Sequence, residues 1–316
     1  MGPSARESCC IADRSSCRPL LHLVFLGLPI FSFFFSMFIG SFQVPPAQLM
    51  DLIASHLFGY STSYPEVYNT VIFQVRLPRI LLGMMVGASL SISGAAFQGV
   101  FRNPLVSPYI LGLSSGAAFG AALSLAFLPG VSIQYAAFFF SLLAVGTTYF
   151  MATSHKSTPT VSLVLAGVIV SAVFDSLLAI IQIAVNEKAL QSIVYWIMGS
   201  LGTASWSKIY SAFPLFALGC TAMLLLRWRL NVLALGDEEA RSVGLNPEVY
   251  KLIFIIAASL AASSAVAVAG IIGLVGLIVP HMLRMIFGPD HRTLMPLALT
   301  FGGSFMVLVD NFARAG

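Results

Sequence analysis

Charged residues are scarce in this chain of 316 residues. Lysine and arginine number 16 and aspartate and glutamate number 12, so 9% of the chain is charged, whereas 58% is hydrophobic. Soluble domains average about 25% charged residues, and a disordered chain needs low hydrophobicity. The composition therefore excludes a water-soluble globule and a disordered protein, and it leaves an integral membrane protein.

The apolar stretches indicate the kind of membrane protein. They run for about twenty residues, the length that crosses the hydrocarbon core of a bilayer as a helix, and they lack the short alternating segments of a membrane barrel. The net charge of +4 comes from basic residues scattered between these stretches, which is typical of membrane topology rather than nucleic-acid binding. We therefore expect an all-α fold, a polytopic transmembrane helical bundle.

Motifs for catalysis and for nucleotide or metal binding are also missing. The pair Lys156-Ser157 lacks the preceding glycine-rich loop that cradles phosphates, and no HExxH, GxSxG or Ser/His/Asp arrangement occurs. The four cysteines form no CxxC or Cys/His pattern. His281 and His291 lie ten residues apart around a turn, which favours histidines at helix ends over a metal site. The sequence predicts no enzyme activity, no cofactor and no metal site.

The polar residues 1–19 are expected to form a cytoplasmic tail, followed by a transmembrane domain at 20–316. The tail contains Cys9, Cys10 and Cys17. The favoured interpretation is that they are reduced thiols, and acylation is the alternative. The apolar run 20–40 is longer than the core of a secretory signal. We therefore interpret it as a retained first span.

Hydrophobic runs predict nine spans, at 20–40, 80–100, 109–128, 132–152, 160–184, 207–226, 250–269, 271–287 and 293–312. The first two are separated by a polar stretch, 41–75, with a possible surface helix near 47–58. The longest polar insert is 227–249.

The lysines and arginines set the orientation. With the N-terminus in the cytoplasm, 11 of the 16 fall in inner segments and 5 in outer segments, as the positive-inside rule requires. The five outer residues are Arg76, Arg79, Lys188, Lys208 and Arg314. Nine spans then place the end of this sequence outside.

Glycines recur at short intervals inside the spans. Small residues let helices approach closely in a membrane, so tight packing is favoured, and a helix that shifts during transport is the alternative. The patterns are Gly83/Gly87, Gly116/Gly120 and the run Gly270, Gly273, Gly276.

Asp175 is a carboxylate within the fifth predicted span. An ionisable residue at membrane depth is a functional candidate, but Asp175 has no obvious basic partner. Asp175 is therefore a candidate for lining a transport pathway. The alternative is that Asp175 has no role in transport.

Three long segments carry a resemblance to a known family. From about residue 20 onward the chain resembles the iron-chelate, heme and cobalamin uptake permeases of the ABC importer class, whose subunits have ten helices. The segments are 75–116, with Val75-Arg76-Leu77-Pro78-Arg79, Gly94-Ala95-Ala96-Phe97-Gln98, Asn103-Pro104-Leu105 and Leu111-Gly112-Leu113-Ser114-Ser115-Gly116; 233–245, with Leu235-Gly236-Asp237-Glu238-Glu239-Ala240-Arg241; and 269–292, with Gly276-Leu277-Ile278-Val279-Pro280-His281.

The resemblance implies a homodimeric permease in the bacterial or archaeal cytoplasmic membrane. Its implied protein partners are two cytoplasmic ABC ATPase subunits and a substrate-binding protein outside the membrane, which is periplasmic in some cells. The permease also contacts membrane lipid. No nucleic acid is expected. The family pattern continues past Arg314 with a tenth helix, so nine of the ten expected helices fall within this sequence.

The polar segment 233–247 is expected to be the ATPase-coupling site. Its residues alone predict a short helix, because acidic groups suit a helix N-terminus and a glycine can cap the other end; a solvated connector is the alternative. The resemblance implies that this helix sits in a groove of the ATPase. The residues are Gly236, Asp237, Glu238, Glu239, Ala240, Arg241 and Gly244.

Arg76, Arg79 and Arg314 form the second expected site. Arginines at span ends commonly snorkel to the membrane surface, which is the simpler interpretation. The resemblance implies that all three receive glutamates of the substrate-binding protein, for which the planar guanidinium is well suited.

These observations predict that the chain is the permease subunit of an ABC importer for a metal chelate. The predicted cargo is an iron-siderophore as first choice, and heme or cobalamin next. An ion-gradient-driven secondary transporter is the alternative, and it would require paired charges at mid-membrane, where only Asp175 qualifies. An intramembrane enzyme is a weaker alternative, because no nucleophile and base form a pair.

Overall fold

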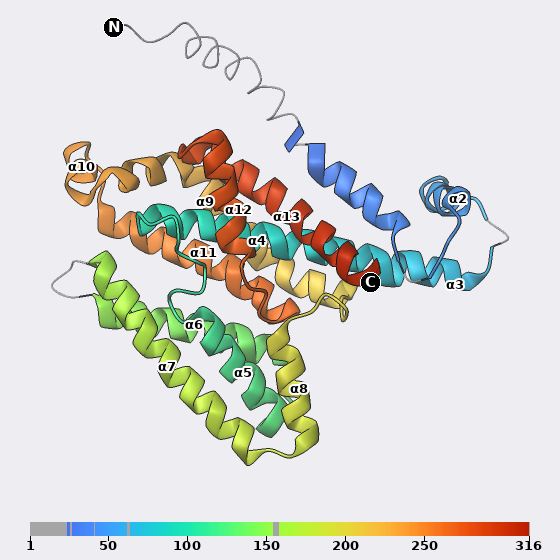
Figure 1. Cartoon of the computed structure of the whole chain (residues 1–316), viewed down its shortest axis with the longest axis horizontal. Helices are drawn as coiled ribbons and strands as arrows, with labels where there is room; N and C mark the ends of the chain where they lie inside the picture. Colours follow the sequence, from blue (N-terminus) through green and yellow to red (C-terminus); the bar gives the residue numbers. More distant parts are fainter. Residues whose placement is uncertain (1–23, 26, 41, 62–63, 154–157, 316) are drawn as a thin grey trace, which may run out of the picture.

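The computed structural model describes residues 24–25, 27–40, 42–61, 64–153 and 158–315. These residues form a bundle of helices without a strand among them, which confirms the predicted fold class (Figure 1). The predicted tail 1–19 and its three cysteines lie outside the described residues.

Among the described residues, nine apolar helices correspond to the nine predicted spans. Six are long enough to cross a membrane: Glu66–Val100, Ile133–Ala152, Thr160–Ala184, Trp206–Leu235, Pro247–Ala269 and His291–Arg314. Three are shorter: Gly27–Phe38, Leu113–Phe127 and Val275–Phe287. The labelled helices are α2 Pro46–Phe58, α3 Glu66–Asn69, α4 Leu77–Val100, α5 Leu113–Phe127, α6 Ile133–Ala152, α7 Thr160–Ala184, α8 Glu187–Met198, α9 Trp206–Leu235, α10 Asp237–Ser242, α11 Pro247–Ala269, α12 Val275–Phe287 and α13 His291–Ala315.

The predicted start of the second span is wrong, whereas its predicted end agrees with Val100. The helix begins at Glu66 rather than near residue 80, because α3 continues into α4 through a wide π-helical turn, Thr70–Arg76. Pro78 has no N–H to donate four residues back, which disfavours a regular α-helix through this point. In the wide turn the N–H of Leu77 bonds instead to the carbonyl of Ile72, five residues back.

The polar insert 227–249 is also more helical than predicted. The helix α9 continues to Leu235, and α10 and the start of α11 occupy most of the remainder. Arg229 lies over the ring of Tyr250, with its guanidinium carbon 5.1 Å from the ring centre, so this charged extension of α9 is packed against α11. The surface helix near 47–58 is confirmed as α2, whereas α8 was not predicted.

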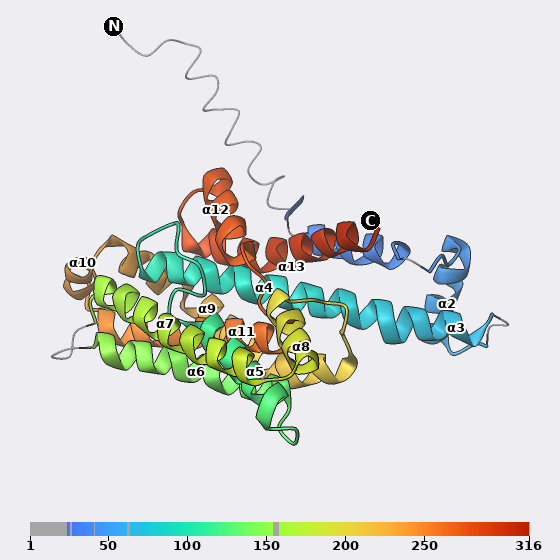
Figure 2. The ribbon, with the colours of Figure 1, turned by 60° about the horizontal axis from the view of Figure 1, so that its bottom comes forward.

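The long helix α4 runs through the middle of the molecule. Within its most apolar stretch 89% of residues are buried, against 22% in α7. Figures 1 and 2 show α9, α11, α12 and α13 around α4, and a second group of helices, α5 to α8, extending to one side. The helix α10 lies at one end of the molecule, and α2, α3 and the C-terminus lie toward the other (Figure 1).

Glycines allow the helices to approach this closely. A Cβ added to Gly94 would lie 1.7 Å from the carbonyl oxygen of Gly276, and one added to Gly87 would lie 2.2 Å from that of Gly302. Gly116 faces the carbonyl of Phe140 in α6 in the same way. The tight-packing interpretation is therefore confirmed at these glycines, in agreement with the role of small residues in membrane helices.

Candidate functional site

The segment 233–247 contains the predicted short helix, α10, at one end of the molecule (Figure 1). Gly236 separates it from α9 with φ +155°, a backbone conformation that residues with a side chain rarely adopt. After the helix, Gly244 takes a left-handed φ of 81° and donates its N–H to the carbonyl of Arg241 at 3.0 Å. This is the predicted glycine cap.

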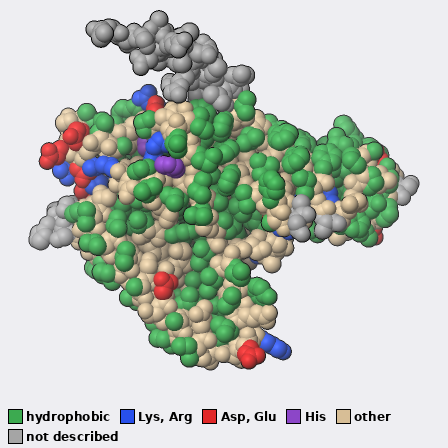
Figure 3. Space-filling view, viewed as in Figure 1, with side chains coloured by type: hydrophobic (Ala, Val, Ile, Leu, Met, Phe, Trp, Pro, Cys, Tyr) green, Lys and Arg blue, Asp and Glu red, His purple; other side chains and the backbone are tan. Residues whose placement is uncertain are grey.

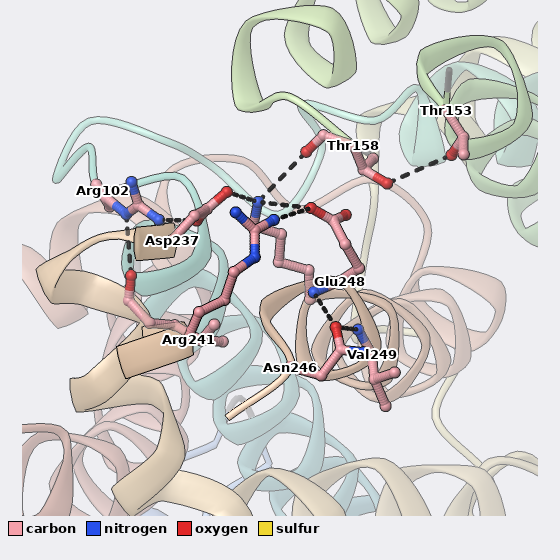
Figure 4. A network of polar contacts seen from close by, with 10 residues as sticks. Arg102, Thr153, Thr158, Asp237, Arg241, Asn246, Glu248 and Val249 are labelled. Carbon is pink, nitrogen blue, oxygen red and sulfur yellow. Dashed lines mark hydrogen bonds and ion pairs between the residues drawn. The ribbon is translucent and has the colours of Figure 1, made fainter. Parts of the chain in front are cut away.

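Asp237 anchors α10 to the rest of the permease (Figure 4). Its Oδ1 accepts a hydrogen bond from Nη2 of Arg102, and its Oδ2 lies 2.5 Å from Nζ of Lys251. Arg102 also donates through Nε to the carbonyl of Leu233 at 2.9 Å. One carboxylate thus joins the end of α4, the end of α9 and the start of α11.

Lys251 occupies the centre of this network, with a side chain only 2% exposed. Besides Asp237, its Nζ lies 3.7 Å from Oε1 of Glu248 and 3.4 Å from the carbonyl of Thr158, at the start of α7. Arg241 approaches the same Glu248 oxygen at 3.9 Å. A buried ammonium needs this compensation, because an unpaired buried charge is costly.

The network also sets the charge state of Asp237. Burial by itself raises the pKa of this carboxyl, but the hydrogen bonds and charges of Lys251 and Arg102 together lower the pKa below its usual value. The carboxylate is therefore ionised throughout the physiological range, and the anchor is intact there.

The other side of α10 faces outward. Ala240 is buried, whereas Glu238, Glu239 and Arg241 are exposed. Val243 at the end of the helix is 66% exposed and adds an apolar group to this surface. The segment thus presents charged and apolar groups on a firmly held helix, an arrangement suited to docking a partner and without groups for covalent chemistry.

The predicted arginine site is at the other end of the molecule, where α4 begins and α13 ends. Arg79 forms a two-pronged ion pair with Asp310, with Nε to Oδ2 at 2.9 Å and Nη2 to Oδ1 at 2.8 Å. Arg314 contacts the same carboxylate through Nε at 3.1 Å. The side chain of Arg79 is 23% exposed and that of Arg314 is 10% exposed.

Arg76 is more deeply placed, with 3% of its surface exposed. It donates to the carbonyl of Met37 at 2.7 Å and to that of Phe42, and a Cβ on Gly40 would strike its guanidinium. The structure therefore places Arg79 and Arg314 on the carboxylate of Asp310 with Arg76 close to Arg314, and Arg76 ties this cluster to the end of the helix Gly27–Phe38.

Asp175 is exposed on α7, a helix that also exposes apolar side chains such as Val173 and Ile180, which are 53% and 63% exposed. No hydrogen bond or ion pair joins Asp175 to another described residue. The structure places it neither in the network of α10 nor in the arginine cluster.

Three residues of these sites were not predicted as site residues from the sequence: Arg102, Lys251 and Asp310. Lys251 offered a signal, because a lysine at the start of an apolar span requires a nearby acid. Only the fold identifies that acid as Asp237 rather than Glu248 alone.

Comparison with known proteins gives a consistent result. Residues 28–316 match the FecCD transport family. The chain is 41% identical over 272 residues to the cobalamin import system permease protein of Halobacterium salinarum, covering 85% of this chain and 72% of the relative. It is 41% identical over 253 residues to the molybdate import system permease protein of Haemophilus influenzae, covering 79% and 74%.

A solved structure gives the same result. It is described as an inward-facing conformation of a metal-chelate type ABC transporter, and it superimposes with a TM-score of 0.82 at 36% identity. The match covers 94% of this chain and 91% of the solved chain. The fold and family that the sequence motifs predicted are confirmed.

Proposed function

Because the chain belongs to the FecCD transport family, we propose that it is the permease subunit of an ABC importer that carries a metal chelate into the cell. The chain is a membrane transport permease, with six helices long and apolar enough to cross a bilayer among its described residues. The observation that carries the proposal is the family match over residues 28–316, together with the close superposition on a metal-chelate type transporter.

The cargo is inferred from the relatives. Those similar to this chain are named for cobalamin, hemin and iron chelatin, and one for molybdate. We propose an iron-siderophore as first choice, with heme or cobalamin next. A secondary transporter driven by an ion gradient was the alternative, and none of these relatives is named as one.

Energy comes from two separate ATPase subunits that dock on the segment 233–247. The exposed side of α10 supports this role, because Glu238 and Arg241 are exposed to a partner while Asp237 fixes the helix to α4 and α11. A rigid connection of this kind transmits the closure of the ATPase pair to the spans. This permease itself performs no catalysis.

The permease functions as a homodimer. The helix α7 supports this assembly, because most of its apolar surface is left uncovered by the chain itself. A second copy covers part of that surface, and the cargo passes between the copies. Asp175 is then a pathway residue, since a carboxylate on an apolar helix requires water or a partner.

An external substrate-binding protein docks on the arginine cluster. Arg79 is its principal contact, since its side chain is the most exposed of the three. Arg314 adds positive charge beside it, and Arg76 contributes by holding the cluster in place. Arg79 and Arg314 share the single carboxylate of Asp310, and Arg76 donates to backbone carbonyls, so the cluster retains positive charge for the acidic groups of a partner.

Reconstitution tests the proposal. The permease is inserted into lipid vesicles with its ATPase, and uptake of a labelled ferric siderophore is followed with the binding protein outside. Uptake is expected only with ATP, the ATPase and the binding protein together. Uptake driven by a proton or sodium gradient without the ATPase would instead establish the secondary transporter.

A further inference from the structure

An open cavity of about 510 Å³ lies where α8, α9 and α11 meet. Its lining includes aromatic and apolar side chains from the end of α8, hydroxyl groups from the turn that follows, and one charged group from α9. Figure 3 shows the surface hollowed where the side group of helices meets the start of α9. The lining residues used below are Tyr195, Trp196, Ser200, Thr203 and Lys208.

Lys208 is the charged group of this cavity, and it has no counter-ion. Its Nζ donates to the hydroxyl of Thr203 at 2.6 Å and to the carbonyl of Val268 at 3.2 Å. No carboxylate lies within ion-pairing distance of it in the described part of the chain. An ammonium has three N–H donors, so one remains for a ligand.

The position of Lys208 in the helix makes this charge unusual. Ser205 caps α9 by accepting the N–H of Lys208, so the lysine sits in the first turn of that helix. The helix dipole favours acidic residues there and disfavours a cation. The positive end of α9 and the ammonium thus reinforce one another at the cavity, and residues that break such local rules are concentrated at functional sites.

The simpler interpretation is that Lys208 caps the end of α11, whose terminal carbonyl it contacts. That role requires a hydrogen-bond donor but no charge. It also leaves the third donor and the shape of the cavity unexplained.

The cavity is built firmly. Gly199 and Gly270 both have positive φ, 68° and 75°, and a Cβ on Gly270 would lie 2.3 Å from the carbonyl of Trp196. The N–H of Ser200 bonds to the carbonyl of Ala269 at 2.7 Å. These contacts fix the end of α8 against the end of α11, so the aromatic side chains and the ammonium keep their relative places.

We propose that this cavity is a subsite for an anionic oxygen group of the cargo, a carboxylate or similar oxyanion on the chelate, which binds Lys208 while Tyr195 and Trp196 contact the apolar body of the ligand. The inference rests on the proposed function for the identity of the cargo. A subsite of this kind would select acidic chelates over uncharged ones. An ammonium is a point charge that accepts such oxygen groups without demanding one geometry.

The test measures the charge preference of the cavity in the full-length permease in lipid vesicles. Cys9, Cys10 and Cys17 are replaced by serine, and Ser200→Cys places a thiol in the lining without disturbing the bonds of Lys208. The thiol is modified with an anionic sulfonate and a cationic ammonium methanethiosulfonate, and the ratio of the two rates is recorded. Citrate is then added as an anionic probe at constant ionic strength.

The anionic reagent is expected to react faster, and citrate to slow it. Lys208→Gln keeps a donor for capping but removes the charge, so the rate ratio should fall by about tenfold, as expected for one unit charge nearby. Lys208→Arg should retain the ratio. Lys188→Gln, at the far end of α8, is the matched control and should change neither measurement.

A rate ratio that is the same with lysine and glutamine at position 208 would overturn the subsite. A charge preference without protection by citrate would overturn it too, because it would show a local potential and no binding. Neither ATP nor a partner is needed, so these outcomes are independent of the reconstitution test of the importer itself.

Discussion

Asp237→Ala is the sharpest test of how α10 is held. The substitution removes the carboxylate that joins Arg102 and Lys251, and it leaves the ammonium of Lys251, 2% exposed, with Glu248 at 3.7 Å as its remaining acid. Removing one partner of a fully buried pair costs about 3–5 kcal/mol. The side chain of Asp237 is 30% exposed and Glu248 remains, so solvent screening reduces the expected cost to about 1–3 kcal/mol.

This loss should appear as local opening of α10. Hydrogen exchange of the amides of α10 is expected to accelerate by about tenfold or more, since about 1.4 kcal/mol corresponds to a factor of ten. In the reconstituted importer, ATP hydrolysis should continue while uptake falls, because a loosened helix transmits less of the closure. Glu238→Gln is the matched control, since this residue is exposed on the same helix and should leave the exchange rates unchanged.

The pH dependence provides a second measurement. The folded pKa of Asp237 is lowered, so its stabilisation is fully present above the unfolded carboxyl pKa of about 4 and is lost as pH falls through the lower folded value. Protection of α10, corrected for intrinsic exchange, should therefore be flat from about pH 5 to 8. Unchanged exchange in Asp237→Ala, or a transition near neutral pH in the wild type, would refute the anchor.

Four further predictions concern ATP hydrolysis, the docking of each of the two partners and the packing of helices. The purified chain alone should hydrolyse no ATP, and the double variant Glu238→Arg with Arg241→Glu should insert normally yet abolish coupled uptake; normal uptake would remove the docking role of α10. Arg79→Glu should slow association of the binding protein by about tenfold at low salt and less at high salt, and equal rates would leave only a structural role for Arg79 in its ion pair with Asp310. Gly94→Ala should prevent a stable fold, seen as aggregation in size-exclusion chromatography, because its Cβ would lie 1.7 Å from the Gly276 carbonyl; a monodisperse variant would contradict the close packing.

The sequence predicted the spans well because apolar runs report directly on a bilayer. It failed at the start of the second span and at the end of the sixth, where composition and backbone conformation diverge. Residues 66–75 are polar enough to suggest a loop, yet the wide turn before Pro78 lets the helix continue through them. The charged end of α9 was missed for a related reason, since Arg229 gains its support from Tyr250 on another helix.

The sites show the same division between local and distant information. Gly236 and Gly244 could be predicted to bound α10, because a helix start and its cap are local features. Their partners could not be predicted, since Arg102 is 135 residues from Asp237 in sequence. The arginines were identified by a motif, but only the fold shows that Asp310 already occupies the guanidinium of Arg79.

The distribution of ion pairs separates two kinds of charge in this permease. The acids and bases that meet one another, such as Asp237 with Lys251 and Asp310 with Arg79, lie at opposite ends of the bundle and join helices there. Asp175 and Lys208 belong to long apolar helices and have no ion pair among the described residues. Since an isolated charge in contact with lipid is costly, we propose that both face water or cargo, and that the transported chelate should be sought along the surfaces of α7 and α9 that carry them.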